Sequence, residues 1–153
     1  MPRKSPVTGR RSGCPLNASV EMLGDRWSLL IIRDMMVLGS RTFKEFLNSY
    51  EKIATNVLSD RLNRLESYGI IKHREDPDDG RKLIYLLTEK GIALAPVLTE
   101  MALWAAAYEE TENQALVNLM RKDKNQFIAE VRERWVAQVA ASDAASRHTK
   151  RVA

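Results

Sequence analysis

Residues 54–87 read ATNVLSDRLNRLESYGIIKHREDPDDGRKLIYLL, and this stretch decides the fold. Its first part, residues 54–68, predicts an amphipathic helix, because at about 100° per residue Leu58, Leu62 and Leu65 share one face. The opposite face carries small polar side chains, namely Asn56, Asp60, Asn63 and Ser67. Such a helix suits a DNA groove, and the same pattern also suits an ordinary surface helix.

A β-hairpin is predicted directly after this helix, which we expect Gly69 to end as a left-handed cap. Residues 70–75 and 83–87 are rich in β-branched and aromatic side chains, and the turn formers Asp-Pro-Asp-Asp-Gly occupy residues 76–80. A polar-faced helix followed by a hairpin is typical of the winged helix-turn-helix plan, in which the hairpin is the wing.

Three shorter helical patterns precede this segment. The first starts near Pro15 and is expected to turn Val20 inward, and the second ends at Gly39. The third covers residues 43–47, with Thr42 as its N-cap. The predicted fold class is therefore mainly α with a small β-hairpin wing, a winged helix-turn-helix followed by C-terminal dimerisation helices.

The C-terminal half is predicted to be helical. A helix capped by Thr88, with an early kink at Pro96, carries more apolar surface than one winged domain usually covers. Further helical patterns follow from about residue 112, with a break near residues 121–124.

We divide the chain into four parts on this basis. Residues 1–13 are expected to form a flexible basic arm, and residues 14–110 a winged helix-turn-helix DNA-binding domain with a dimer helix. Residues 111–141 are expected to form a C-terminal helical extension, and residues 142–153 a frayed tail.

Composition suits one globular domain with an appendage, since the chain has 153 residues of which 44% are hydrophobic. The net charge is +4, and the four basic residues of the first dozen account for all of this excess. That arm either contacts phosphates or is a solvated tail. The longest apolar run, residues 29–32, is far shorter than the roughly 20 residues of a membrane span, so no membrane partner is expected.

The location expected for the chain is the cytoplasm. No apolar segment follows the basic N-terminus, so no secretory signal is recognised. The single cysteine excludes an internal disulfide and fits a reducing compartment.

Catalytic chemistry has little support in the sequence. The two histidines, His73 and His148, have no partner at metal-ligand spacing, and the seven glycines form no phosphate-binding loop. We therefore predict no catalytic residues, no metal and no cofactor, and a protein that is not an enzyme.

Several short motifs stand in a fixed order between residues 14 and 108. They are Cys14-Pro15, Gly24-Asp25-Arg26-Trp27, Val57-Leu58-Ser59-Asp60-Arg61-Leu62, Leu87-Thr88 with Gly91, Pro96-Val97 and Trp104. In combination they resemble the HxlR-type transcriptional regulators of the MarR-like winged-helix group. The resemblance implies a homodimer that binds double-stranded DNA at a pseudo-palindromic operator and regulates nearby genes, most simply as a repressor.

The resemblance also implies DNA contacts at particular positions. They are Arg41, Lys44, Thr55, Asn56, Ser59, Arg64, Arg81 and Lys82. Asparagine can read adenine, serine either kind of base, and arginine guanine or phosphate. Arg41 and Lys44 suit phosphate positioning, and the pair at 81–82 suits contacts from the wing.

Apolar residues of the C-terminal half are candidates for the dimer interface. They are Leu98, Met101, Trp104, Phe127, Val131 and Trp135. The last three continue with Val139 as a stripe that packs either on the partner subunit or on the protein's own core. We favour the partner, because an exposed apolar stripe needs a cover.

Two kinds of signal are alternatives for controlling the regulator. Cys14 precedes a predicted helix beside basic residues, which favours a reactive thiolate, so it is either a sensor of oxidants and electrophiles or a silent cysteine. Alternatively, Trp27, Trp104 and Tyr108 either line a pocket for a small apolar effector or simply fill the core.

One rival function remains beside the DNA-binding regulator. A winged helix can also serve as a protein-interaction module, and the neutral charge of the chain beyond its basic arm keeps that alternative open.

Overall fold

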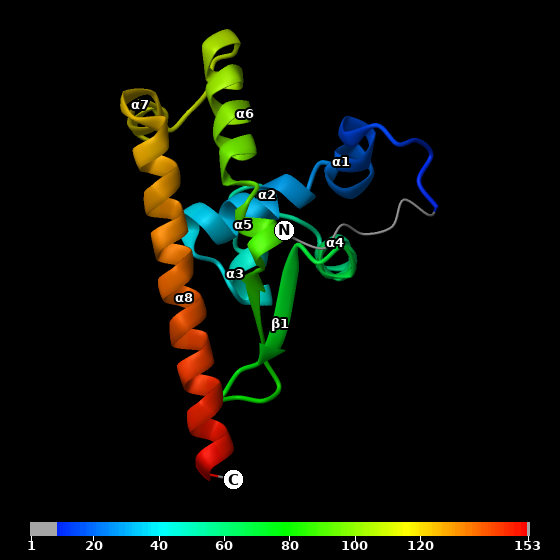
Figure 1. Cartoon of the computed structure of the whole chain (residues 1–153), viewed down its shortest axis with the longest axis vertical. Coiled ribbons are helices and arrows are strands. Elements are labelled where there is room, and N and C mark those ends of the chain that lie inside the picture. Colours follow the sequence, from blue (N-terminus) through cyan, green and yellow to red (C-terminus); the bar gives the residue numbers. More distant parts are fainter. Residues whose placement is uncertain (1–8, 153) are drawn as a thin grey trace.

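The computed structural model describes residues 9–152, with side chains described as far as Arg147. Its elements, in chain order, are α1 (Pro15–Leu23), α2 (Ser28–Arg33), the π-helical turn η1 (Asp34–Leu38), α3 (Phe43–Leu47), α4 (Thr55–Ser67), β1 (Ile71–Glu75), β2 (Leu83–Leu87), α5 (Glu89–Ile92), α6 (Ala95–Tyr108), α7 (Gln114–Lys122) and α8 (Lys124–Val152). Figure 1 shows α8 along one side of the molecule, with α6 and the hairpin pointing toward opposite ends.

The predicted winged helix-turn-helix fold is confirmed. Helix α4 buries the predicted stripe, since Leu58, Leu62 and Leu65 are all at most 1% exposed. The helix ends at the predicted position, because Gly69 has a φ of +69°, a left-handed conformation that glycine adopts without strain. The predicted fold around residues 54–69 is thus correct.

Helix α3 begins with a capping box. The Thr42 hydroxyl accepts a hydrogen bond from the Glu45 amide, and the Glu45 carboxylate accepts one from the Thr42 amide at 2.8 Å. Thr42 was predicted as the cap, while the return bond from Glu45 was not. Because both groups are satisfied locally, this helix of five residues has a defined start.

The hairpin is antiparallel, with Ile71 opposite Leu87 and Glu75 opposite Leu83. A short stretch before α3 extends it, since the Tyr85 amide donates to the Arg41 carbonyl at 2.8 Å and a β-bridge joins Thr42 to Ile84. The middle of β2 is therefore attached to the segment that leads into α3.

Two expectations about the helices are wrong. Val20 is 57% exposed, because α1 touches the core mainly through Leu23. Pro96 does not kink a continuous helix: α5 ends at Ile92 and Pro96 lies in the first turn of a new helix, α6. Proline is tolerated there because its missing amide would have no helical partner.

The prediction that residues 142–153 form a frayed tail is also wrong. Helix α8 is continuous to Val152, beyond the predicted end of the extension at residue 141. Ser142 is 3% exposed, and its hydroxyl accepts a hydrogen bond of 2.6 Å from Arg74 Nε on β1. Contact with the wing therefore orders a segment that its composition alone leaves unstructured.

One described stretch, Glu89–Tyr108, is long and apolar enough to cross a membrane by length and composition, with a mean hydropathy of 1.4. The expectation of no membrane span rested only on the uninterrupted apolar run at residues 29–32 and therefore missed this longer stretch. Length and composition alone are weak grounds for a span, and here the stretch contains the break between α5 and α6. Since 22% of it is buried within the chain, its exposed face needs a cover.

We predict that Trp135 joins α8 to the wing. Its Nε1 donates a buried hydrogen bond of 2.9 Å to the Leu87 carbonyl. Trp135→Phe removes that donor and should lower the free energy of unfolding by about 1–3 kcal/mol, measured by urea denaturation. The neighbouring Val136→Ala, at a 56% exposed position, should change it by less than about 0.5 kcal/mol. Equal stability of the native chain and Trp135→Phe would contradict this role.

Candidate nucleic-acid interface

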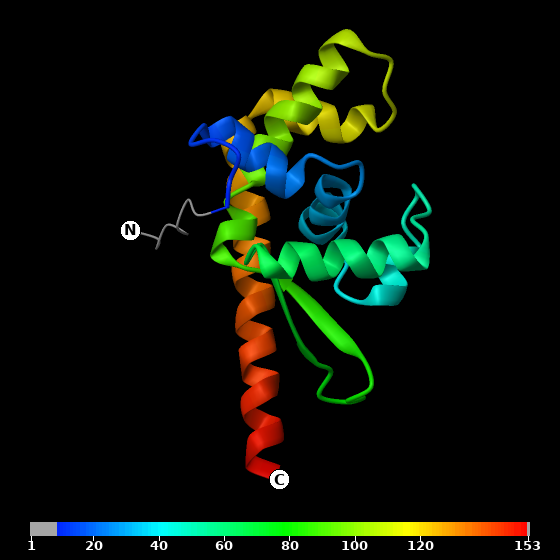
Figure 2. The same cartoon turned by 90° about the vertical axis from the view of Figure 1, so that its right-hand side faces the viewer.

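The N-terminal half of α4 presents the best-formed candidate surface. Thr55, Asn56 and Ser59 are exposed; Asn56 lies opposite the buried leucines of the same helix, and Ser59 lies at the edge of that polar face. Figure 2 shows α4 crossing the molecule with the hairpin beside it. Because helix and wing lie on one side, both can face the same ligand.

Arg64 occupies a different place from the one predicted. Its Nη2 donates at 2.5 Å to the Glu21 carbonyl of α1, and its guanidinium lies 5.7 Å from the centre of the Tyr68 ring. Arg64 therefore joins α1 to α4 in this conformation, and its charge is turned away from the exposed N-terminal half of the helix. Its contact with DNA stays a prediction that this geometry does not favour.

Arg61 is a residue that sequence reasoning missed. It is half-buried on α4, with Nε 3.6 Å from the Asp25 carboxylate and Nη2 3.6 Å from Asp60. Asp60 therefore faces Arg61, and not Arg64. On the predicted helix, Arg61 is three residues from Leu58, so helical spacing indicated that it lies beside the buried face. The spacing did not indicate its partner Asp25, which lies before α2.

Asp25 is the other end of this contact and lies in the loop before α2. Its carboxylate accepts hydrogen bonds from the Trp27 amide at 2.8 Å and the Ser28 amide at 2.9 Å. Burial raises the pKa of Asp25, but the hydrogen bonds from Ser28 and Trp27 outweigh it, so the pKa lies below its usual value.

The other predicted phosphate contacts surround α4. Lys44 is exposed on α3, whereas Arg41 is half-buried. At the wing tip, the side chain of Arg81 is 92% exposed and that of Lys82 is 65% exposed, but both pair with Asp79 at 3.2 and 3.3 Å. Hydrogen bonds from Arg81 and Lys82 lower the pKa of Asp79, so this carboxylate offsets part of the charge of the tip.

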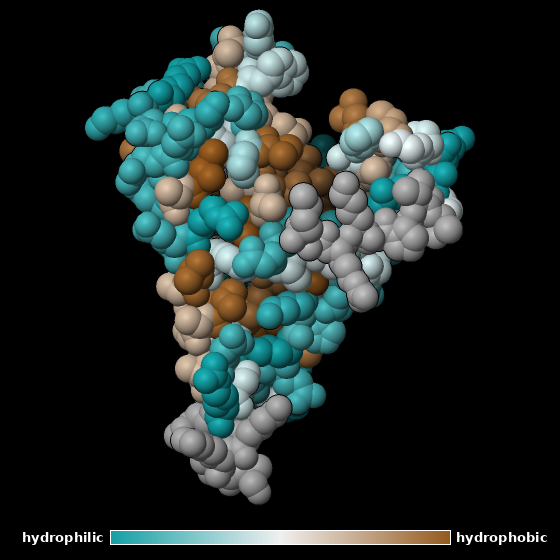
Figure 3. All heavy atoms as spheres, viewed as in Figure 1, coloured by the Kyte–Doolittle hydropathy of each residue, from teal (hydrophilic) through white to brown (hydrophobic). Residues whose placement is uncertain are grey.

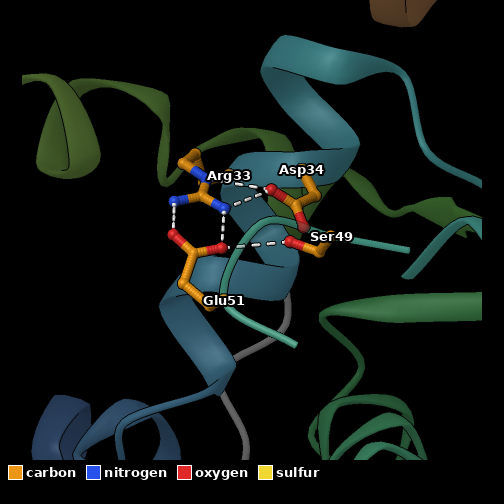
Figure 4. A network of polar contacts seen from close by, with 4 residues as sticks. All are labelled: Arg33, Asp34, Ser49 and Glu51. Atoms are coloured by element: carbon orange, nitrogen blue, oxygen red, sulfur yellow. Dashed lines mark hydrogen bonds and ion pairs between the residues drawn. The ribbon is translucent and has the colours of Figure 1, made fainter. Parts of the chain in front are cut away.

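A polar network fixes the loop that leads into α4 (Figure 4). Arg33 forms two hydrogen bonds with Glu51, at 2.6 and 2.8 Å, and two more with the buried Asp34. Ser49 donates to the same Glu51 carboxylate at 3.0 Å. The hydrogen bonds from Arg33 lower the pKa of Glu51 to about 2, so Glu51 is ionised at neutral pH.

The residues predicted to line an effector pocket do not lie together in the structure. Trp27 packs against the core, whereas Trp104 is 66% and Tyr108 75% exposed, with their rings 6.1 Å apart. The pocket predicted from these three side chains is therefore not formed, because the two on α6 point outward. Cys14 is exposed at the N-cap of α1. Among the described residues no group of acidic, histidine or cysteine side chains could hold a metal.

The candidate dimer residues fall into two groups. Val131 and Trp135 are 2% and 9% exposed and belong to the hydrophobic core of the same chain, so placing them at the dimer interface was wrong. Leu98 and Phe127 are half-buried against that core. On α6, Met101 and Trp104 remain outside, at 49% and 66% exposed. The stripe on α8 thus covers its own subunit, the alternative that we did not favour.

These features define a winged helix-turn-helix transcription regulator. The HxlR-like helix-turn-helix family matches residues 22–113, which are 92 of the 153 residues, and the chain belongs to that family. The matched range includes α2 to α6, while α7 and α8 lie beyond it.

Known regulators resemble the same part of the chain. The transcriptional regulator YodB of Bacillus subtilis is 39% identical over 98 residues, which are 63% of this chain and 87% of YodB. PA1607, described as a transcription factor, superposes with a TM-score of 0.61 at 33% identity, over 68% of this chain and 71% of PA1607. The oxidised redox regulator HypR superposes with a TM-score of 0.56 at 26% identity, over 64% of this chain and all of HypR.

We predict a pH-dependent contribution from Glu51. Its pKa is lowered from 4.5 to about 2, so the pairing with Arg33 stabilises the fold above pH 4.5 and this contribution is lost as pH falls toward 2. Since both side chains are partly exposed, we expect about 1 kcal/mol. Glu51→Gln should be less stable than the native chain by that amount at neutral pH, with the difference vanishing in acid.

Urea unfolding across a pH series would measure this difference. Glu110→Gln, at an exposed position between α6 and α7, is the matched control and should follow the native curve. A constant difference between Glu51→Gln and the native chain at all pH values would show that the charge of Glu51 is not the cause.

Proposed function

We propose that this transcription regulator is a sequence-specific DNA-binding protein that acts as a homodimer on a pseudo-palindromic operator, and that it represses transcription. The observation that carries the proposal is the exposed N-terminal half of α4, held outward by three buried leucines. In helix-turn-helix proteins the N-terminal residues of the second helix contact base edges.

The side chains on this surface suit the two parts of the task. Asn56 and Ser59 carry groups that can read bases in the major groove. Lys44 on the preceding helix and Arg81 with Lys82 on the wing supply positive charge for phosphates, which fix the register without reading the sequence.

The dimer would form along α6. Val97, Met101, Trp104 and Tyr108 are 46%, 49%, 66% and 75% exposed, and they recur at alternating spacings of four and three residues. This is the spacing of a helix–helix seam. Figure 3 shows hydrophobic side chains at the surface where α6 runs. We propose that a second copy of the chain covers this exposed face of α6. Helix α6 lies within the part of the chain that the family matches.

The signal proposed for the regulator is an oxidant or electrophile acting at Cys14. The thiol is exposed at the start of α1, and α1 is joined to α4 through the bond from Arg64 to the Glu21 carbonyl. Among the relatives, YodB has been solved in a reduced and a quinone-bound form, and HypR in a reduced and an oxidised form. With one cysteine in this chain, a disulfide would have to join two subunits or a small thiol.

We predict that Asn56 contributes to sequence preference. Asn56→Ala should weaken binding to the operator by about 1–3 kcal/mol, roughly 5- to 150-fold, while binding to random DNA changes little. Lys44→Ala should weaken binding to both DNAs and reduce the salt dependence by about one ion. Mobility shifts with the DNA upstream of the protein's own gene, or with a site selected from random sequence, would measure both.

Matched controls lie on α7, away from α4. Asn118→Ala and Lys122→Ala remove the same side chains at exposed positions and should leave operator binding unchanged. If no sequence is preferred even after selection, the DNA-binding proposal fails, and capture of a specific protein would favour the interaction-module alternative.

We predict that a charge on the α6 face separates the subunits. Trp104→Glu places a carboxylate in the proposed seam and should give a monomer by sedimentation at concentrations where the native chain is a dimer. Ala107→Glu is on the same helix at an exposed position outside the seam and should remain a dimer. A monomeric native chain would contradict the proposed assembly.

We predict that Cys14→Ser abolishes the response to oxidants. The variant should bind the operator as tightly as the native chain under reducing conditions, because Cys14 makes no side-chain cap of α1. On treatment with diamide or a quinone, the native complex should dissociate and the Cys14→Ser complex should persist in mobility shifts. Equal release of both proteins would exclude Cys14 as the sensor.

A further inference from the structure

An apolar cavity of about 210 Å³ lies between α2, η1, α6, α7 and α8. Its walls include Leu30 and Met36 from the winged domain and Leu98 from α6. Leu116, Met120 and Phe127 complete it from α7 and α8, which lie outside the region matched by the family. The cavity is therefore a product of the C-terminal extension packing on the winged domain.

The polar groups in its wall are already satisfied. Arg33 is the one charged side chain of the lining, and its guanidinium is paired with Glu51 and Asp34. The hydroxyl of the buried Thr99 donates to the Ala95 carbonyl at 2.8 Å. An anionic ligand beside Arg33 would meet two carboxylates that already neutralise that cation, so the cavity favours an uncharged occupant.

A second copy of the chain is not the expected occupant. At about 100° per residue, Leu98 and Ala102 point roughly a third of a turn away from the centre of the exposed face of α6 that holds Val97, Trp104 and Tyr108. Met101, at the edge between them, is the residue that the cavity and that face share. A partner helix seated on the exposed face would thus leave the cavity open to a small molecule.

We infer that this cavity binds an uncharged, largely apolar molecule of one or two rings. An apolar cavity of about 150 Å³ in another protein accepts benzene, so the larger volume here suits a substituted benzene or a fused pair of rings. No hydrogen-bonding group of the lining is left to demand a polar ligand.

A ligand in this cavity would be linked to α4, the helix proposed to contact DNA, through few residues. Arg33 lines the cavity and also holds Glu51, in the loop that precedes α4. Leu98 and Met101 line it from the helix that carries the proposed dimer seam. A role as a signal site rests on the proposed function, whereas ligand binding itself does not.

Calorimetric titration of the full-length protein would test the inference, with naphthalene as the probe and 1-naphthoate as its charged counterpart. We expect naphthalene to bind with one site per chain, and naphthoate at least about tenfold more weakly. Absence of naphthalene binding up to its solubility limit would overturn the inference, as would equal binding of the two probes.

Filling the cavity provides the matched comparison. Ala102→Leu places three additional carbons in the lining and should reduce naphthalene affinity at least about tenfold, while Ala107→Leu, on the same helix outside the cavity, should not. Leu116→Phe fills the cavity from α7 and serves if Ala102→Leu does not fold. Unchanged binding by a folded, filled variant would place the probe elsewhere and refute the site.

The operator complex separates the two proposals. Naphthalene binding without any DNA complex would leave the cavity site intact and refute the regulator mechanism. A specific DNA complex without naphthalene binding would support the regulator mechanism and refute the cavity site.

Discussion

Burial of one leucine stripe on α4 is the constraint on which the arrangement of the candidate interface depends. Leu58, Leu62 and Leu65 are almost completely removed from water, and burying three leucines contributes several kcal/mol. Rotating α4 about its axis would expose that stripe, so the face with Asn56 and Ser59 must point outward. The polar face thus owes its orientation to apolar packing on the other side, not to any contact of its own.

Helices α7 and α8 add a second layer to this winged domain. Helix α8 buries Val131 and Trp135 against the core of that domain, holds the base of the wing at the Leu87 carbonyl, and reaches its outer part through Ser142. The wing is therefore supported over its length by a helix from outside the family's matched region.

The sequence predicted the elements better than their partners. Helical period and turn residues identified α4, the hairpin and the cap at Thr42, because these features depend on neighbours a few residues away. The partner of Arg64 is 43 residues distant in the chain, and that of Trp135 is 48 residues distant, so local pattern did not reveal either. For the same reason, the apolar stripe on α8 was recognised but its cover was assigned to the wrong subunit.

The attachment of α8 to the wing has a consequence for the order in which the protein matures during synthesis. Strand β2 ends at Leu87, yet its supports on α8 are Trp135, 48 residues further along the chain, and Ser142, which follows later still. At a synthesis rate of about 5–20 residues per second, these 48 residues take roughly 2–10 seconds to add, so the winged domain is made before its supports. The nascent hairpin is therefore unbraced during that interval and reaches its supported form only once α8 has been made.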